Sequence, residues 1–88
     1  MAQIITKTNG TTLVEIADTT IDTTTTSLTL PGNGTLVSGQ LFNTNLVRLL
    51  ENFAAATAPA NPIRGQLWFD TTRQVFKVYD GASWNLLK

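Results

Sequence analysis

Carboxylates are the side chains of this sequence most able to do chemistry, because its 88 residues include neither histidine nor cysteine. The commonest acid/base group and thiolate chemistry are therefore excluded. Two carboxylates could still cleave a glycosidic bond if a fold held them ~5 to 10 Å apart. Asp70 and Asp80 are the candidate pair, but they bracket a predicted strand at its two ends, and a rise of ~3.3 Å per residue separates them too widely. We predict instead that both form turns by accepting hydrogen bonds from local amides.

Metal, anion and nucleophile sites have weaker candidates. Asp18 and Asp22 lie among threonines, but they lack the dense oxygen-ligand spacing of a calcium loop, so solvated loop carboxylates are the preferred interpretation. The glycines of Pro31-Gly-Asn-Gly34 precede a predicted helix, yet no Gly-Lys-Ser/Thr follows them. No histidine is present to activate a serine or threonine. The sequence thus predicts a protein that is not an enzyme, with no metal or cofactor, and a small hydrolase relying on Asp70 and Asp80 is the minor alternative.

The aromatic residues allow two interpretations. Trp68, Tyr79 and Trp84 could form a platform on which a sugar stacks, because rings with a polar tip suit a half-wet site. They could equally pack against the helix or another subunit. We favour packing, because these residues lie on predicted strands rather than on loops, where binding groups usually gather.

The elements that position these residues begin with the last third of the chain, which predicts strands at residues 66–70, 75–79 and 84–87. Polar residues 71–73 join the first two, and Asp80-Gly81 is a strong turn signal before the third. Side chains alternate along a strand, so both faces of this meander carry large apolar groups. Such a sheet must be shielded from water on both faces by other parts of the protein or by a partner. We expect the helix on one face and the N-terminal hairpin or a partner subunit on the other.

The first third of the chain predicts a β-hairpin. Residues 3–8 and 11–17 are rich in Ile, Val, Leu and Thr and flank Asn9-Gly10, the preferred pair for a type I′ turn. Residues 18–29 are dominated by threonine, which favours extended chain. We predict an extended, exposed or edge-paired segment there, because residues 27–30 restore strand alternation, and low-complexity disorder is the alternative.

A helix is predicted over residues 38–56. Ser38 is its candidate N-cap, and Pro59-Ala-Asn-Pro62 prevents its continuation. The apolar residues of this segment follow the i, i+3, i+4 spacing of one helical stripe, which consists of Phe42, Leu46, Leu49, Leu50 and Phe53.

The composition bounds the partners. Six basic and six acidic residues give a formal net charge of zero and are scattered, which argues against nucleic acid or an anionic membrane. No segment approaches the ~20 apolar residues of a membrane span, and the N-terminus lacks the pattern of a signal peptide. A chain of this length buries only roughly 60 to 65% of its extended surface, so we expect stability to come partly from a partner.

Together these elements predict a small α+β protein, organised as a single domain over residues 1–88. Its parts are an N-terminal β-hairpin with an extended strand, one central amphipathic helix and a C-terminal three-stranded antiparallel meander. The candidate core and interface residues belong to the helix and the meander: Phe42, Leu46, Leu49, Leu50, Phe53, Leu67, Trp68, Phe69, Val75, Phe76, Val78, Tyr79 and Trp84.

Part of this sequence resembles a known family. Pro62-Ile-Arg-Gly-Gln-Leu-Trp-Phe-Asp-Thr-Thr, followed by Phe76-Lys-Val-Tyr-Asp-Gly-Ala-Ser-Trp84, resembles the Gly-x-Leu-Trp-aromatic-Asp-Thr and Val-Tyr-Asp-Gly-x-x-Trp pattern of tail-fibre and other virion structural proteins of tailed bacteriophages. Residues 27–32, 49–53 and 58–62 resemble the module that often precedes it. The pattern is commonly repeated inside long fibres, whereas a single copy is present here, which favours a small tail, baseplate or fibre-attachment component.

The resemblance implies a non-enzymatic structural role: self-association, often threefold in fibres, and docking to other virion proteins. The expected location is the phage particle, in its tail, after synthesis in the cytoplasm of the host bacterium. Two alternatives remain open. One is a capsid decoration protein, and the other is a carbohydrate- or receptor-binding module that contacts a host-surface glycan through Trp68, Tyr79 or Trp84.

Overall fold

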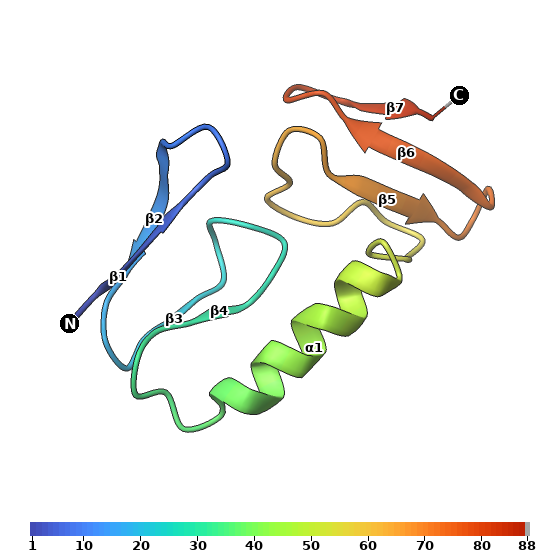
Figure 1. Ribbon diagram of the computed structural model, residues 1–88. Coiled ribbons are helices and arrows are strands. Elements are labelled where there is room, and N and C mark those ends of the chain that lie inside the picture. Colours follow the sequence, from blue (N-terminus) through green and yellow to red (C-terminus); the bar gives the residue numbers. More distant parts are fainter. Residues whose placement is uncertain (88) are drawn as a thin grey trace. The chain divides into compact units, whose positions relative to one another are not determined.

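The computed structural model describes residues 1–87, and the chain folds as two compact units, Met1–Asn45 and Leu46–Lys88. Within the described residues, one α-helix accompanies three antiparallel sheets (Figure 1). Two sheets of two strands lie in the first unit, and one sheet of three strands lies in the second. The predicted α+β class is therefore confirmed, with an N-terminal hairpin, a helix and a C-terminal meander.

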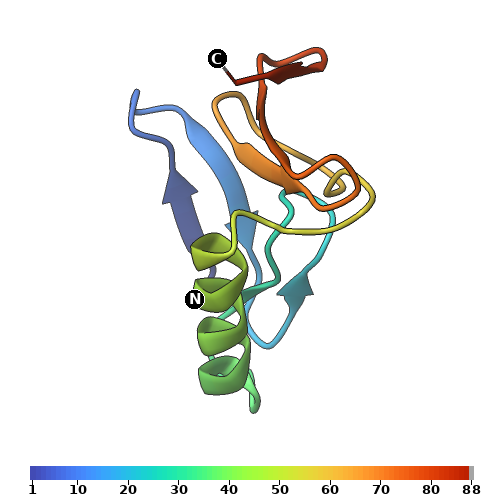
Figure 2. The same ribbon diagram turned by 90° about the vertical axis from the view of Figure 1, so that its right-hand side faces the viewer.

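The N-terminal hairpin consists of β1 (Gln3–Thr6) and β2 (Thr12–Ile16), which pair antiparallel as predicted (Figures 1 and 2). The predicted type I′ turn is wrong, because that turn needs positive φ at both central residues and only Gly10 has it, with φ of 90°. The amide of Gly10 instead donates to the carbonyl of Lys7, and the register shifts between Ile5 and Thr6. The loop is longer than a two-residue turn and contains a bulge at Gly10. It keeps β1 and β2 paired up to Ile16, which is only 3% exposed.

The threonine-rich segment is only partly extended. β3 (Ile21–Asp22) pairs antiparallel with β4 (Leu30–Pro31), and residues 23–29 form the loop between them. The predicted extended, exposed or edge-paired segment is paired at Ile21–Asp22 and is interrupted beyond it, because Asp22 bends the chain: its carboxylate accepts hydrogen bonds from the amides of Thr24 and Thr25 and from the Thr25 hydroxyl. A short polar side chain that satisfies nearby amides favours a turn over strand pairing.

Helix α1 (Ser38–Leu50) is shorter than the predicted 38–56. Its first helical hydrogen bond runs from the Leu41 amide to the Val37 carbonyl, so Val37 occupies the N-cap position that we predicted for Ser38. Its C-terminus is closed by two bonds, from the Asn52 amide to the Leu49 carbonyl and from the Phe53 amide to the Arg48 carbonyl. With Asn52 at φ of 54°, this is a Schellman motif, and it ends the helix before the alanines that follow.

The one buried residue of α1 is polar. Asn45 is 8% exposed, and its side-chain amide donates to the carbonyl of Thr29 at 2.6 Å and accepts from the amide of the same residue at 3.1 Å. A single side chain thus satisfies both backbone groups of a loop residue 16 positions earlier in the chain. This contact holds the threonine-rich loop against the first half of the helix.

The meander in the second unit matches its prediction closely. β5 (Leu67–Asp70), β6 (Val75–Tyr79) and β7 (Trp84–Leu86) form one antiparallel sheet in the order β5-β6-β7. The chain just after the helix runs beside the free edge of β5, where the Phe69 amide donates to the Asn52 carbonyl and the Ala55 amide donates to the Phe69 carbonyl. That edge is therefore covered within the same unit.

Candidate functional site

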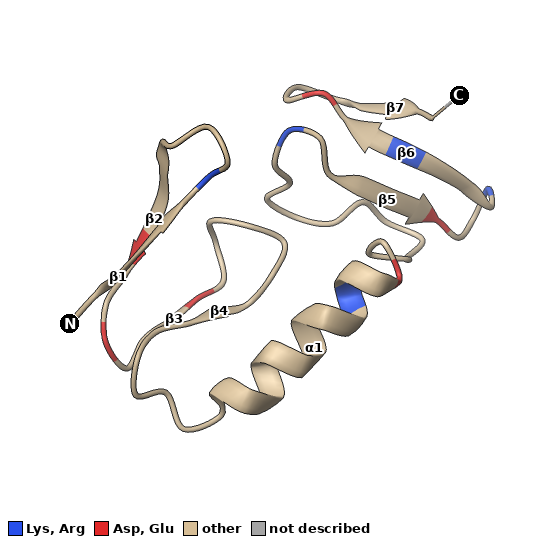
Figure 3. Ribbon diagram, viewed as in Figure 1, with Lys and Arg blue, Asp and Glu red and all other residues tan. Residues whose placement is uncertain are grey.

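The most prominent surface feature is an apolar face of α1 that carries Phe42, Leu46, Leu49 and Leu50, which we call the helix stripe. These side chains are 61%, 49%, 49% and 83% exposed, respectively. At 3.6 residues per turn they fall within an arc of about 100° on the helix surface. Arg48 is the charged residue of α1, and no charge lies on the stripe itself (Figure 3). A continuous apolar face thus lies open to solvent.

The last predicted member of this stripe lies beyond the helix. Phe53 follows the Schellman motif, has φ of 55° and is half-buried. Of the predicted helix residues, the four on α1 form one exposed surface, and Phe53 belongs to the chain that turns back toward β5.

One face of the meander is built around Trp68, which is 6% exposed. Its ring lies edge-on to Trp84 with centroids 5.5 Å apart, and the Lys77 ammonium nitrogen is 5.0 Å from its centroid. Its indole nitrogen donates to the Ala55 carbonyl at 3.2 Å. Trp84 also packs against Tyr79, with centroids 5.2 Å apart. These contacts place Trp68 in the interior of the unit, where it does not offer an open ring to a sugar.

The opposite face of the meander carries the remaining aromatic pair. Phe69 and Phe76 face each other across β5 and β6, with centroids 4.9 Å apart and planes inclined by 64°. Leu67 and Val78 form the next cross-strand pair and are half-buried, while Phe76 is 40% exposed. Val75, at the start of β6, lies on the Trp68 face and is also half-buried. Both faces are apolar, as predicted.

Asp70 is the most buried carboxylate in the second unit, at 4% exposed. One of its oxygens accepts hydrogen bonds from the amides of Thr72 and Arg73, and the other accepts from the Lys77 ammonium group at 3.1 Å. Burial acts to raise the pKa of Asp70, but the Lys77 bond and the two amides outweigh it and hold that pKa below its ordinary value of 3.8. The predicted turn role fits this geometry. The ion pair with Lys77 was not predicted, although a lysine seven residues after an aspartate across a short turn is a usable signal.

The lowered pKa of Asp70 predicts acid sensitivity. Because the unfolded chain binds the proton more tightly than the folded one, the stabilisation by Asp70 is present above about pH 4 and is lost as the pH falls through the folded-state pKa. We expect the midpoint of urea unfolding to fall between pH 5 and about pH 2.5, and Lys77→Gln to reduce this fall. A wild-type midpoint that stays constant over the same range would contradict the prediction.

Two further aspartates hold turns. The Asp80 carboxylate accepts from the amides of Ser83 and Ala82, each at 2.8 Å, and from the Asn85 side chain, and these bonds lower the pKa of Asp80. The Thr25 hydroxyl and amide and the Thr24 amide likewise lower the pKa of Asp22. Across residues 1–87, no three His, Cys, Asp or Glu side chains form a group that could hold a metal ion. Asp22, Asp70 and Asp80 are thus each accounted for by local structure.

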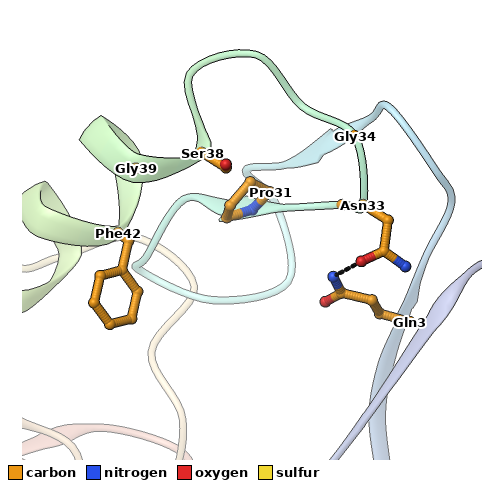
Figure 4. A pocket seen from close by; sticks show the side chains of 8 residues that line it. Gln3, Pro31, Asn33, Gly34, Ser38, Gly39 and Phe42 are labelled. Carbon is orange, nitrogen blue, oxygen red and sulfur yellow. Dashed lines mark hydrogen bonds between the residues drawn. The ribbon is translucent and has the colours of Figure 1, made fainter.

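The first unit contains an open hollow of about 390 Å³ at the start of α1. Figure 4 shows the Phe42 ring on one side of it and, on another, the side chains of Gln3 and Asn33, joined by a hydrogen bond of 2.6 Å. Pro31, Ser38 and Gly39 complete much of its wall. The polar lining is neutral, and the hollow adjoins the N-terminal end of the helix stripe through Phe42.

Comparisons with protein-family models, curated proteins and solved structures find no match to this chain. In the described part of the chain, no helix has both the length and the apolar character needed to cross a membrane.

Proposed function

We propose that this protein is a non-enzymatic structural component of a tailed-bacteriophage particle, which assembles with copies of itself and with neighbouring virion proteins. A small tail, baseplate or fibre-attachment component fits best. The observation that carries the proposal is the helix stripe, a set of large apolar side chains 49% to 83% exposed on a regular helix.

The distribution of apolar side chains supports assembly. Among residues 1–87 the buried hydrophobic residues are Ile16 and Trp68, and no large side chain is completely buried. Leu50, by contrast, is 83% exposed. An apolar patch of this kind on a soluble protein typically marks a surface that another molecule covers.

The use of the carboxylates supports a structural role. Asp22, Asp70 and Asp80 each accept two backbone amides in a turn. Their pKa values are lowered by side-chain bonds, from Thr25 to Asp22 and from Lys77 to Asp70, and by those amides. A general acid needs the opposite change, because it must hold its proton near neutral pH. These groups are adapted to hold loops.

The residues that carry the resemblance to phage structural proteins are also the residues that build the meander. Trp68 and Asp70, from the first part of the pattern, provide the buried ring and the turn-holding carboxylate. Asp80 and Trp84, from the second part, provide the next turn and the ring that packs on Trp68. These four residues of the pattern thus each help to build the sheet, which supports a structural role for it.

The proposal is tested by the state of the protein in solution and in the particle. We expect light scattering on the purified chain to give the mass of a multimer, and antibody labelling of particles of the encoding phage to mark the tail. Labelling spread over the head would favour a decoration protein. A monomer that is also absent from purified particles by mass spectrometry would overturn the proposal.

A further inference from the structure

We infer that the helix stripe is the surface by which this protein binds a second copy of itself, α1 against α1. The inference rests on the proposed function, because it assigns the self-association to one surface. Phe42, Leu46 and Leu49 follow one another at intervals of four and three residues. This alternation brings side chains to one side of a helix at each turn and is the spacing with which two helices interlock.

The size of the stripe fits a helix–helix contact. With exposed fractions of 61%, 49%, 49% and 83%, its four side chains present roughly 500 Å² of apolar surface. Two stripes completely buried against each other would cover about 1,000 Å², which is the minimum total area expected of a biological interface. The hollow of about 390 Å³ beside Phe42 extends the same surface and gives a partner side chain a place to enter.

The chemistry of the helix favours a copy of the same chain as the occupant. A helix that lies on a membrane normally flanks its apolar face with several Lys and Arg residues, whereas Arg48 is the charged residue of α1. A strongly charged partner would likewise find no side chains of opposite charge on the helix stripe. An uncharged apolar face complements itself, because two copies can meet without opposing like charges.

The structure shows which residues border the helix stripe and which lie on the other side of α1. Asn45, at one margin, is buried through its bonds to Thr29 and is therefore unavailable to a partner. Gln40 and Thr44 lie on the opposite side of the helix from Phe42 and are exposed polar residues. These two positions provide matched controls on the same element.

The first experiment places charge on each side of α1. We expect the double substitution Leu46→Glu and Leu49→Glu to weaken self-association by about 100-fold or more, because the interface would bury unpaired carboxylates. Gln40→Glu with Thr44→Glu introduces the same charge on the other side and should leave the molar mass by light scattering unchanged. Far-UV circular dichroism of each variant verifies that the helix is retained.

The second experiment does not depend on disrupting the stripe. Because the sequence has no cysteine, Leu46→Cys introduces a single thiol at the centre of the stripe, where the same residue of two copies meets in either helix orientation. Mild oxidation should convert this variant to a covalent dimer, whereas Thr44→Cys should give at least tenfold less dimer at the same concentration.

The outcomes separate the two proposals. If the wild-type protein is a multimer, but the glutamate pair leaves its mass unchanged and Leu46→Cys is not cross-linked, the assignment to the helix stripe is overturned while the structural role stands. If the wild-type protein is a monomer at about 0.5 mM, self-association through any surface is overturned, and with it the assignment.

Discussion

Replacing Trp68 by alanine is expected to lower the free energy of unfolding by about 4 kcal/mol. Trp68 is one of the two buried hydrophobic residues among residues 1–87, and its ring contacts Trp84 and the Lys77 ammonium group. Removing it leaves a cavity at the centre of one face of the meander and deletes the indole donor to Ala55. A protein of this size has roughly 5 to 10 kcal/mol of stability in total, so only about 1 to 6 kcal/mol would remain and unfolding should begin at a much lower temperature.

Two substitutions calibrate this result, each measured by urea unfolding and far-UV circular dichroism. Trp68→Phe keeps most of the ring and removes the hydrogen bond, so we expect a loss of about 1 kcal/mol. Phe76→Ala removes a ring that is already 40% exposed, so it should cost less than half of the Trp68→Ala effect. If Phe76→Ala and Trp68→Ala had equal effects, Trp68 would not be the anchor of the sheet.

The second large effect is expected from Gly32→Ala, which should destabilise the first unit by about 3 kcal/mol. A methyl group at residue 32 would lie 2.3 Å from the carbonyl oxygen of Ala17 and 3.0 Å from that of Thr20. Both obstacles are backbone atoms, so no change of rotamer relieves the clash. The same stretch of chain carries the bond from the Gly32 amide to the Thr20 carbonyl, at 2.7 Å, which joins β3 to β4.

The matched control for this change is Gly39→Ala, which adds the same methyl group in the first turn of α1. No heavy atom lies within 4 Å of that position, and alanine favours the helix more than glycine does, so we expect a gain of about 0.5 kcal/mol. Chemical denaturation followed by circular dichroism gives both values. The prediction is contradicted if Gly32→Ala unfolds within about 0.5 kcal/mol of the wild-type protein.

The secondary structure was predictable where local signals agree. The meander follows from alternating apolar residues and from aspartates that accept the amides of the next turn, and these contacts join residues no more than 11 positions apart. The hairpin was predictable in place, but its turn was not, because Asn9-Gly10 suits two loop types that differ in the register of the flanking strands. The helix end at Asn52 was missed because asparagine in the left-handed conformation is a weaker signal than the prolines beyond it.

By itself, the sequence determined the α+β class, the apolar stripe of the helix and the absence of histidine and cysteine chemistry. Only the tertiary structure decided which apolar residues are covered: Trp68 is buried, whereas Leu46, Leu49 and Leu50 remain exposed. Tertiary structure likewise decided that Asn45 is the buried residue of the helix and that Lys77 pairs with Asp70. The physical reason is that periodicity reports which residues share a face, while burial depends on partners that are distant in the chain or belong to another molecule.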